Sequence, residues 1–196
     1  VTVELVDGEV GYIKLSQITS NSTELVEEAV KNLQEAGATC YVLDLRNNPG
    51  GYLTQAVDIG SLFLKSGVMV KIETKDSPET TREADTESIT DAPLVIIING
   101  KTAAAAEVLA GGLQDQSRAT VVGETSMGKG SVQSIYHLSF GGALRYTSAY
   151  YKTPNGYEIN NVGISPDVQV AMGSSSSDDA QKSLAVDTAK SLAQQS

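Results

Sequence analysis

Three short apolar runs, separated by segments of helical periodicity, constrain the fold of this chain more than any other feature. They are TCYVLDLR at residues 39–46, PLVIIIN at residues 93–99 and RATVVG at residues 118–123. A near-continuous apolar run of this length is typical of a strand buried on both faces of a parallel sheet. Helical patterns over residues 54–64 and 103–113 lie between these runs, so the sequence predicts an α/β fold.

The segment before the first apolar run is expected to form a hairpin and a helix. VTVELVDGEVGYIKLS contains two strand-like stretches around Asp7 and Gly8, a pair of residues typical of a hairpin turn. Asn21 followed by Glu24 is a cap signal, and the apolar stripe that follows continues until Gly37. The chain is therefore expected to begin with a hairpin and then a helix.

Further strands are expected outside the three apolar runs. VMVKIET at residues 68–74 predicts a strand, and the polar stretch from Lys75 to Asp91 predicts a surface excursion. SVQSIYHLSF, ALRYTSAYY and the segment up to Val170 predict strands joined by turns.

A chain of 196 residues is long enough for one domain with a substantial core. We expect residues 1–172 to form this core and residues 173–196 to form a Ser-rich linker and a C-terminal helix. The net charge of −10 argues against nucleic acid or an anionic membrane as a partner, because proteins bind both of these through an excess of Lys and Arg side chains. Cys40, the only cysteine, is expected to be a buried structural thiol.

Chemistry is expected in the loops that follow the buried strands, because α/β proteins bind ligands at that end of the sheet. In NNPGG at residues 47–51, the paired glycines allow a backbone N–H to point at a ligand oxygen, although a plain tight turn explains the same residues. NGKTAAAAEVLAGG at residues 99–112 combines free N–H groups at a helix start with small side chains. Alanine is also the best helix former, so both interpretations of this segment stay open.

The loop GETSMGKGSVQ at residues 123–133 is the most informative. Lys129 lies between two glycines just after a buried strand, a position that suits an amine reaching into a cleft. Burial would lower the pKa of that amine from about 10.4 towards neutrality and make it a general base. Gln133 is expected on the same strand face, where it could orient the amine. The loop lacks P-loop spacing, so nucleotide binding is not expected.

Two other kinds of site find little support. His137 is the only histidine and lies in an alternating strand without a nucleophile motif nearby, so a Ser/His/Asp triad is not expected. We expect His137 to be a half-exposed strand residue instead. The scarcity of His and Cys also argues against a metal site.

Four motifs in order resemble the carboxyl-terminal processing (tail-specific) serine proteases. They are LDLRNNPGG, NGKTAAAAEVLAGGLQD, VVGETSMGKGSVQ and TPNGYEINNVGISPDVQV, and the resemblance covers roughly residues 10–170. The family motif has the form N-x-x-[ST]-A-S-A-[AS]-E, in which the middle serine is the nucleophile, and that position is Ala104 here. The resemblance implies a crotonase/ClpP-like core of repeated ββα units with an added β-rich segment and a C-terminal helix.

The resemblance also implies roles for individual residues of a serine endopeptidase that cleaves polypeptides near or from their C-termini. Lys129 would be the general base, Gln133 would orient it, and the backbone N–H groups of Gly50 and Ala105 would form the oxyanion hole. Asp115 would be structural. Neither a cofactor nor a metal is implied.

Ala104 lacks the oxygen that covalent attack requires, so we expect this chain to be inactive. An engineered Ser→Ala exchange is favoured over a natural peptide-binding pseudoprotease. Thr102 lies two residues earlier and would face elsewhere. An acyl-CoA enzyme of the crotonase type is a third interpretation, because such enzymes also have an oxyanion hole made of two amides.

The implied partners are peptides or unfolded proteins, which would bind as an added strand along a sheet edge. Homo-oligomer formation is one option. The family usually carries a PDZ domain, which in the full-length protein would precede residue 1. The resemblance favours the bacterial cell envelope, in a periplasmic or extracytoplasmic location with a membrane anchor in the full-length protein.

Overall fold

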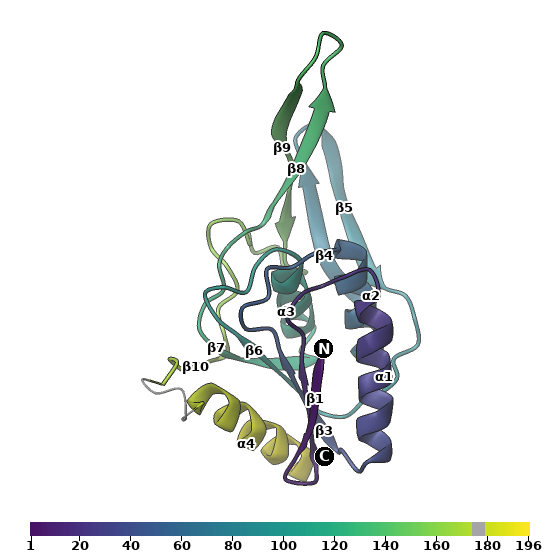
Figure 1. The fold of residues 1–196 in the computed structure, drawn as a ribbon, viewed down its shortest axis with the longest axis vertical. Helices are drawn as coiled ribbons and strands as arrows, with labels where there is room; N and C mark the ends of the chain where they lie inside the picture. Colours follow the sequence, from purple (N-terminus) through teal and green to yellow (C-terminus); the bar gives the residue numbers. More distant parts are fainter. Residues whose placement is uncertain (174–178) are drawn as a thin grey trace.

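The computed structural model describes residues 1–173 and 179–196 and shows a body with a narrow extension (Figure 1). The sheet of the body pairs, in this order, β1 (Thr2–Val6), β2 (Val10–Lys14), β3 (Cys40–Asp44), β6 (Leu94–Ile98), β7 (Ala119–Gly123) and β10 (Val168–Gln169). The extension is a second sheet that pairs, in this order, β5 (Ser77–Ala84), β4 (Gly67–Thr74), β9 (Ala143–Lys152) and β8 (Ser131–His137). The helices are α1 (Ser22–Glu35), α2 (Leu53–Phe63), α3 (Ala105–Asp115) and α4 (Ala180–Gln194). The predicted α/β class is confirmed.

The first sheet is parallel apart from its N-terminal hairpin. β1 pairs antiparallel with β2 through Asp7 and Gly8, whose φ angles of 51° and 72° suit a tight hairpin turn. β2, β3, β6, β7 and β10 then pair in parallel. Every residue of β3 and β6 is buried, which confirms the prediction drawn from these apolar runs.

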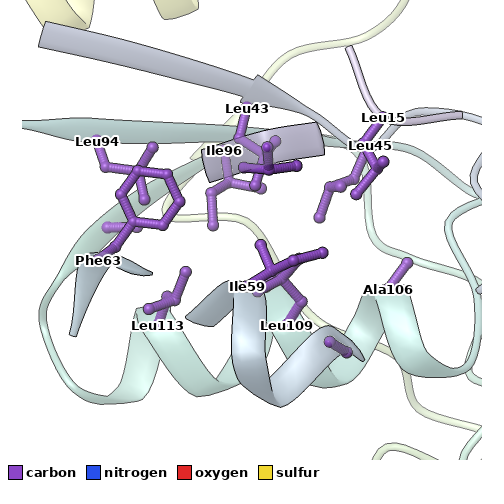
Figure 2. Close-up of a cluster of buried hydrophobic side chains, with 14 of the residues drawn as sticks. Leu15, Leu43, Leu45, Ile59, Phe63, Leu94, Ile96, Ala106, Leu109 and Leu113 are labelled. Carbon is purple, nitrogen blue, oxygen red and sulfur yellow. The ribbon is translucent and has the colours of Figure 1, made fainter. Parts of the chain in front are cut away.

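Helices cover both faces of this sheet. Leu43 and Ile96 belong to the large core cluster, and Figure 2 shows them facing Ile59 of α2 and Leu109 of α3. Because side chains alternate along a strand, their neighbours in sequence lie on the opposite face. There Val42 and Val95, for example, pack in a second cluster with Ala185, Val186 and Ala189 of α4.

A buried polar network connects α4 to the end of β3. The Arg46 guanidinium donates from Nε and Nη2 to Asp44 and from Nη1 and Nη2 to Asp179, with distances of 2.6 to 3.1 Å. Tyr12 also donates its hydroxyl to Asp44 over 2.6 Å. Although burial acts to lower it, the pKa of Arg46 is raised by the hydrogen bonds to Asp44 and Asp179. The same bond to Arg46 lowers the pKa of Asp179 below its usual 3.8.

Several element predictions need correction. The stretch from Lys75 to Asp91 is mostly exposed, as predicted, but Ser77–Ala84 within it form the strand β5, which was not expected. Most of its residues are exposed, and backbone pairing with β4 holds it. Helix α3 begins at Ala105 rather than at residue 103, because Ala104 has a positive φ angle. In the segment up to Val170, the predicted strand is only Val168–Gln169.

The start of α1 is confirmed, but its cap differs from the one expected. Asn21 occupies the N-cap position without a side-chain cap hydrogen bond. Its Oδ1 instead accepts from the hydroxyl of Thr19, and the Thr19 N–H donates to Ser22 Oγ over 2.8 Å. The cap signal therefore predicted where the helix begins but not the hydrogen bonds that form there.

The C-terminal helix is confirmed, whereas the Ser-rich linker at 174–177 lies outside the described residues. The boundary at residue 172 and the crotonase/ClpP-like ββα repeat remain predictions. Cys40 is fully buried, as expected. Among the described residues, none of the helices combines the length and the hydropathy that spanning a bilayer requires.

Candidate active site

Ala104 lies in a strained turn between β6 and α3. Its φ and ψ angles are 53° and −122°, in a region that residues with a Cβ rarely adopt, and it occupies the N-cap position of α3. A strained turn between a strand and a helix is a known device for exposing a nucleophile. The turn at Ala104 shares this kind of strained backbone, although its side chain is a methyl group.

The NNPGG loop packs directly against this turn. A Cβ placed on Gly50 would lie 2.8 Å from the oxygen of Ala103, 2.9 Å from the nitrogen of Ala105 and 3.0 Å from Cβ of Ala104. The backbone N–H of Ala103 donates to the backbone carbonyl oxygen of Asn48 over 2.9 Å. The structure therefore brings together Gly50, Ala104 and Ala105, three residues that the sequence predicted to share a site.

The two predicted oxyanion-hole amides differ in their hydrogen bonds. The Ala105 N–H has no acceptor among the described residues and lies at the positive end of the α3 dipole. The Gly50 N–H instead donates to Oδ1 of Asn48 over 2.8 Å. Only the Ala105 amide is therefore free to receive a substrate oxygen without a local rearrangement.

Glu107 is a functional candidate that the sequence analysis missed. Its fully buried carboxylate accepts the N–H groups of Ala104 and Lys129 at Oε2, each over 2.9 Å. Oε1 accepts the N–H of Gly128 over 2.7 Å and the hydroxyl of Ser126. These four donors satisfy the buried carboxylate and fix the turn at residue 104 to the loop at residue 129. A glutamate three residues after the helix N-cap, as in a capping box, was the available signal.

The loop of residues 124–130, called the lysine loop below, is held on two sides. The backbone N–H of Met127 donates to the backbone carbonyl oxygen of Thr102 over 2.9 Å. On the other side, the oxygen of Gly128 accepts the N–H of Asn161 over 2.8 Å. These contacts, together with those of Glu107, fix the path of the backbone that carries Lys129.

The side chain of Lys129 does not have the environment expected from the sequence. It is exposed, whereas a buried amine was predicted, because the loop backbone faces the protein while its side chain faces solvent. The structure thus joins the backbone of Lys129 to the site and leaves its amine in contact with water.

Gln133 makes no hydrogen bond to Lys129 in this structure. Its exposed side chain donates from Nε2 to the hydroxyl of Thr147 over 2.7 Å and to that of Ser131 over 3.3 Å. Lys129 precedes the first residue of β8, so the alternation of side chains along the strand does not place it on the face of Gln133.

Three other polar residues have structural surroundings. Thr102 is fully buried, and its hydroxyl donates to the oxygen of Leu45 over 2.8 Å, so it does not replace a nucleophile at position 104. Asp115 accepts the N–H of Asn155 over 2.9 Å, in line with its expected structural role. His137 is exposed at the end of β8 rather than half-exposed.

Comparisons with known proteins agree with these motifs. Residues 9–170 match the sequence model of peptidase family S41. The carboxyl-terminal-processing protease of Synechocystis sp. is 46% identical over 158 residues, covering 81% of this chain and 37% of that protein. The carboxy-terminal-processing protease of Bartonella bacilliformis is 43% identical over 171 residues, covering 84% and 39%. A solved structure of a photosystem II D1 C-terminal processing protease has 40% identity and a TM-score of 0.78, covering 82% of this chain and 42% of that one.

The chain spans about two fifths of the length of these curated relatives. The family match nevertheless covers the Gly50 loop, the Ala104 turn and the lysine loop in one continuous range. On this evidence the chain belongs to peptidase family S41.

Proposed function

We propose that this chain is the core of a carboxyl-terminal processing serine peptidase and that its nucleophile position is occupied by Ala104. The observation that carries the proposal is the strained backbone of Ala104 at the start of α3. Strain of this kind persists at sites where geometry serves function, and an alanine gains nothing from it. The names and the identities of the relatives support the same reaction class.

The proposed parent reaction is acyl transfer through a serine at position 104. Neutral Lys129 takes the proton from the serine hydroxyl, and the oxygen attacks a peptide carbonyl. The N–H of Ala105 and then that of Gly50 stabilise the oxyanion, each by about 2.7 to 4 kcal/mol, as donors do in comparable sites. The Gly50 donor becomes available when it leaves Asn48. When the tetrahedral intermediate collapses, the C–N bond breaks and the Lys129 ammonium gives its proton to the leaving amine. Water then gives a proton to the neutral Lys129 as it attacks the acyl-enzyme, which releases the new C-terminal carboxylate and restores the serine hydroxyl.

The exposed amine of Lys129 fits this scheme if the substrate completes the site. A bound polypeptide that covers the lysine loop excludes water from the amine, and exclusion of water favours the neutral form. Gln133 orients the amine in the proposed active arrangement, which requires its side chain to exchange Thr147 for Lys129. Glu107 holds the backbone around this exchange without entering the chemistry.

We further propose that the present chain binds polypeptides without cleaving them. Ala104 removes the nucleophilic oxygen, whereas the Gly50 loop, Glu107 and Lys129 are retained. An engineered Ser→Ala exchange accounts for this pattern, and a natural pseudoprotease is the second candidate because position 104 is its only lost element. The codon at position 104 in the parent gene separates the two. No contact among the described residues favours the acyl-CoA interpretation.

The remaining proposals concern the full-length protein. Its substrates are peptides or unfolded proteins, and a PDZ domain lies elsewhere in the chain. Its compartment is extracytoplasmic, in the bacterial cell envelope. These proposals rest on the family alone, and the relatives also include a C-terminal processing peptidase named as chloroplastic, from Tetradesmus obliquus.

Restoring the oxygen tests the catalytic proposal. The Ala104→Ser variant should cleave casein, a polypeptide without a stable fold. The double variant Ala104→Ser, Lys129→Ala should cleave casein at least about a hundredfold more slowly, which is the loss typical of a missing general base. Circular dichroism shows whether both variants are folded. A folded Ala104→Ser protein without activity, or one whose activity survives Lys129→Ala, would overturn the proposed mechanism.

A further inference from the structure

The outer edge of β8 lacks the features that normally keep an edge strand from pairing. β8 is the last strand of the second sheet, and its sequence SVQSIYH contains neither proline nor an Asp, Glu, Lys or Arg residue. β5, at the opposite edge, has the sequence SPETTREA, with one proline and three charged residues. Charged residues and proline protect natural edge strands from pairing with other chains. In an acidic protein, an uncharged seven-residue edge therefore indicates a strand that accepts a partner.

The hydrogen-bonding pattern shows which groups of β8 face outward. Leu138 donates its N–H to the oxygen of Gly142, which sets the bonded positions at the hairpin end. In an antiparallel pair, bonded and non-bonded positions alternate along the strand. In the observed register, Gln133 and Ile135 fall at non-bonded positions, so their N–H and C=O groups point away from β9. These groups form a ladder with no partner strand among the described residues.

This ladder leads directly to the candidate active site. β8 begins at Ser131, two residues after Lys129, whose N–H shares a carboxylate oxygen with that of Ala104. The register shift between Val132 and Gln133 lies at the same end of the strand, and bulges often redirect strands beside active sites. An extended chain paired with β8 would continue past Lys129.

We propose that the free edge of β8 is the binding site for the substrate polypeptide, which adds to the second sheet as an extended strand. The proposal rests on the proposed function and deepens it by naming the strand that holds the substrate. Main-chain hydrogen bonds to Gln133 and Ile135 give affinity with little demand on sequence. The bound strand also covers the lysine loop, which is the step that excludes water from the amine of Lys129.

Replacing one outward N–H tests the proposal. Ile135→Pro removes this donor and leaves the bonds to β9 intact, because proline is tolerated at the outer side of an edge strand. Ile135→Ala is the matched variant that keeps the N–H and reports only on the side chain. Binding of fluorescein-labelled casein to the Ala104 protein, followed by anisotropy, should be about three- to tenfold weaker for Ile135→Pro than for Ile135→Ala. Equal affinities for two folded variants would overturn the proposal.

Hydrogen exchange gives a second, direct readout. Adding unlabelled casein should slow exchange of the Gln133 and Ile135 amides by at least about tenfold, because they become donors in a ladder. Protection that instead grows with protein concentration in the absence of casein would identify a second copy as the occupant and would overturn the substrate assignment.

The two proposals fail in different ways. If Ala104→Ser cleaves casein and Ile135→Pro in that background leaves KM unchanged, the edge proposal is wrong and the catalytic one stands. If Ala104→Ser is folded and inactive but casein still protects Gln133 and Ile135, the edge binds polypeptides and the catalytic proposal is wrong.

Discussion

The backbone amides of Ala104 and Lys129 donate hydrogen bonds to the same oxygen, Oε2 of Glu107, each over 2.9 Å. The two residues come from separate loops, one before α3 and one before β8. The geometry between the proposed nucleophile position and the proposed base therefore depends on a third side chain that makes no contact with a reacting atom in the proposed mechanism.

Glu107→Gln should destabilise the fold and disorder the site. The new amide group would face N–H donors where an oxygen now accepts them, and buried donors left without acceptors cost about 2 to 4 kcal/mol in total. Urea denaturation measures this free energy of unfolding. Glu87→Gln, at an exposed carboxylate, is the control and should change it by less than about 0.5 kcal/mol. Equal changes for both variants would contradict the assigned role of Glu107.

Gly50→Ala should be more destabilising than Gly141→Ala. Both glycines have positive φ angles, 92° and 100°, so both substitutions carry backbone strain of about 1 to 2 kcal/mol. A Cβ on Gly50 would also meet three backbone or Cβ atoms of residues 103–105 at 3.0 Å or less, whereas none lies within 4 Å of a Cβ on Gly141. Thermal unfolding of the two variants measures the packing contribution as a difference. Similar losses would show that the Gly50 loop does not press against the Ala104 turn.

Ala104→Gly should stabilise the protein by about 1 kcal/mol. Glycine relieves backbone strain of about 1 to 3 kcal/mol at the positive φ angle, and this relief exceeds its cost in conformational entropy. Ala106→Gly lies inside α3, where glycine should instead cost about 1 kcal/mol. Denaturant midpoints of the two variants should shift in opposite directions. A loss at both positions would mean that the turn at residue 104 is not strained.

The attachment of α4 should weaken in acid. The hydrogen bond from Arg46 lowers the pKa of Asp179 in the folded state below the usual 3.8, so its contribution to stability is fully present above that value. The contribution is lost as pH falls through the lower, folded-state pKa. Asp179→Asn keeps a helix-capping side chain but removes the charge. The difference in free energy of unfolding between the two proteins should shrink between pH 5 and pH 2, and a constant difference would exclude the Arg46 pair as its source.

The main sheet was predictable because its strands carry their own signal. In β3 and β6, burial on both faces forces an apolar residue at nearly every position, and no helical spacing competes with that pattern. β5 was missed because SPETTREA has no apolar alternation. Its exposed side chains give no core face, and pairing with the backbone of β4 decides its conformation.

The site was predictable only where residue type sets geometry. Gly50 was named through the resemblance to the family, and the structure brings it to the Ala104 turn, where the close backbone approach requires glycine. The exposure of the Lys129 amine and the face of Gln133 were not predictable. Both depend on where β8 begins, and that boundary has no residue signature. Glu107 became recognisable once its distant donors were in place.

The lysine loop is attached mainly through main-chain groups, since the N–H donors of Met127, Gly128 and Lys129 exist whatever the side chains are. The side chain of Met127 is 53% exposed, and the bonds that hold the loop do not use it. Substitutions at position 127 can therefore change the surface chemistry beside Lys129 while the main-chain bonds keep the path of the loop.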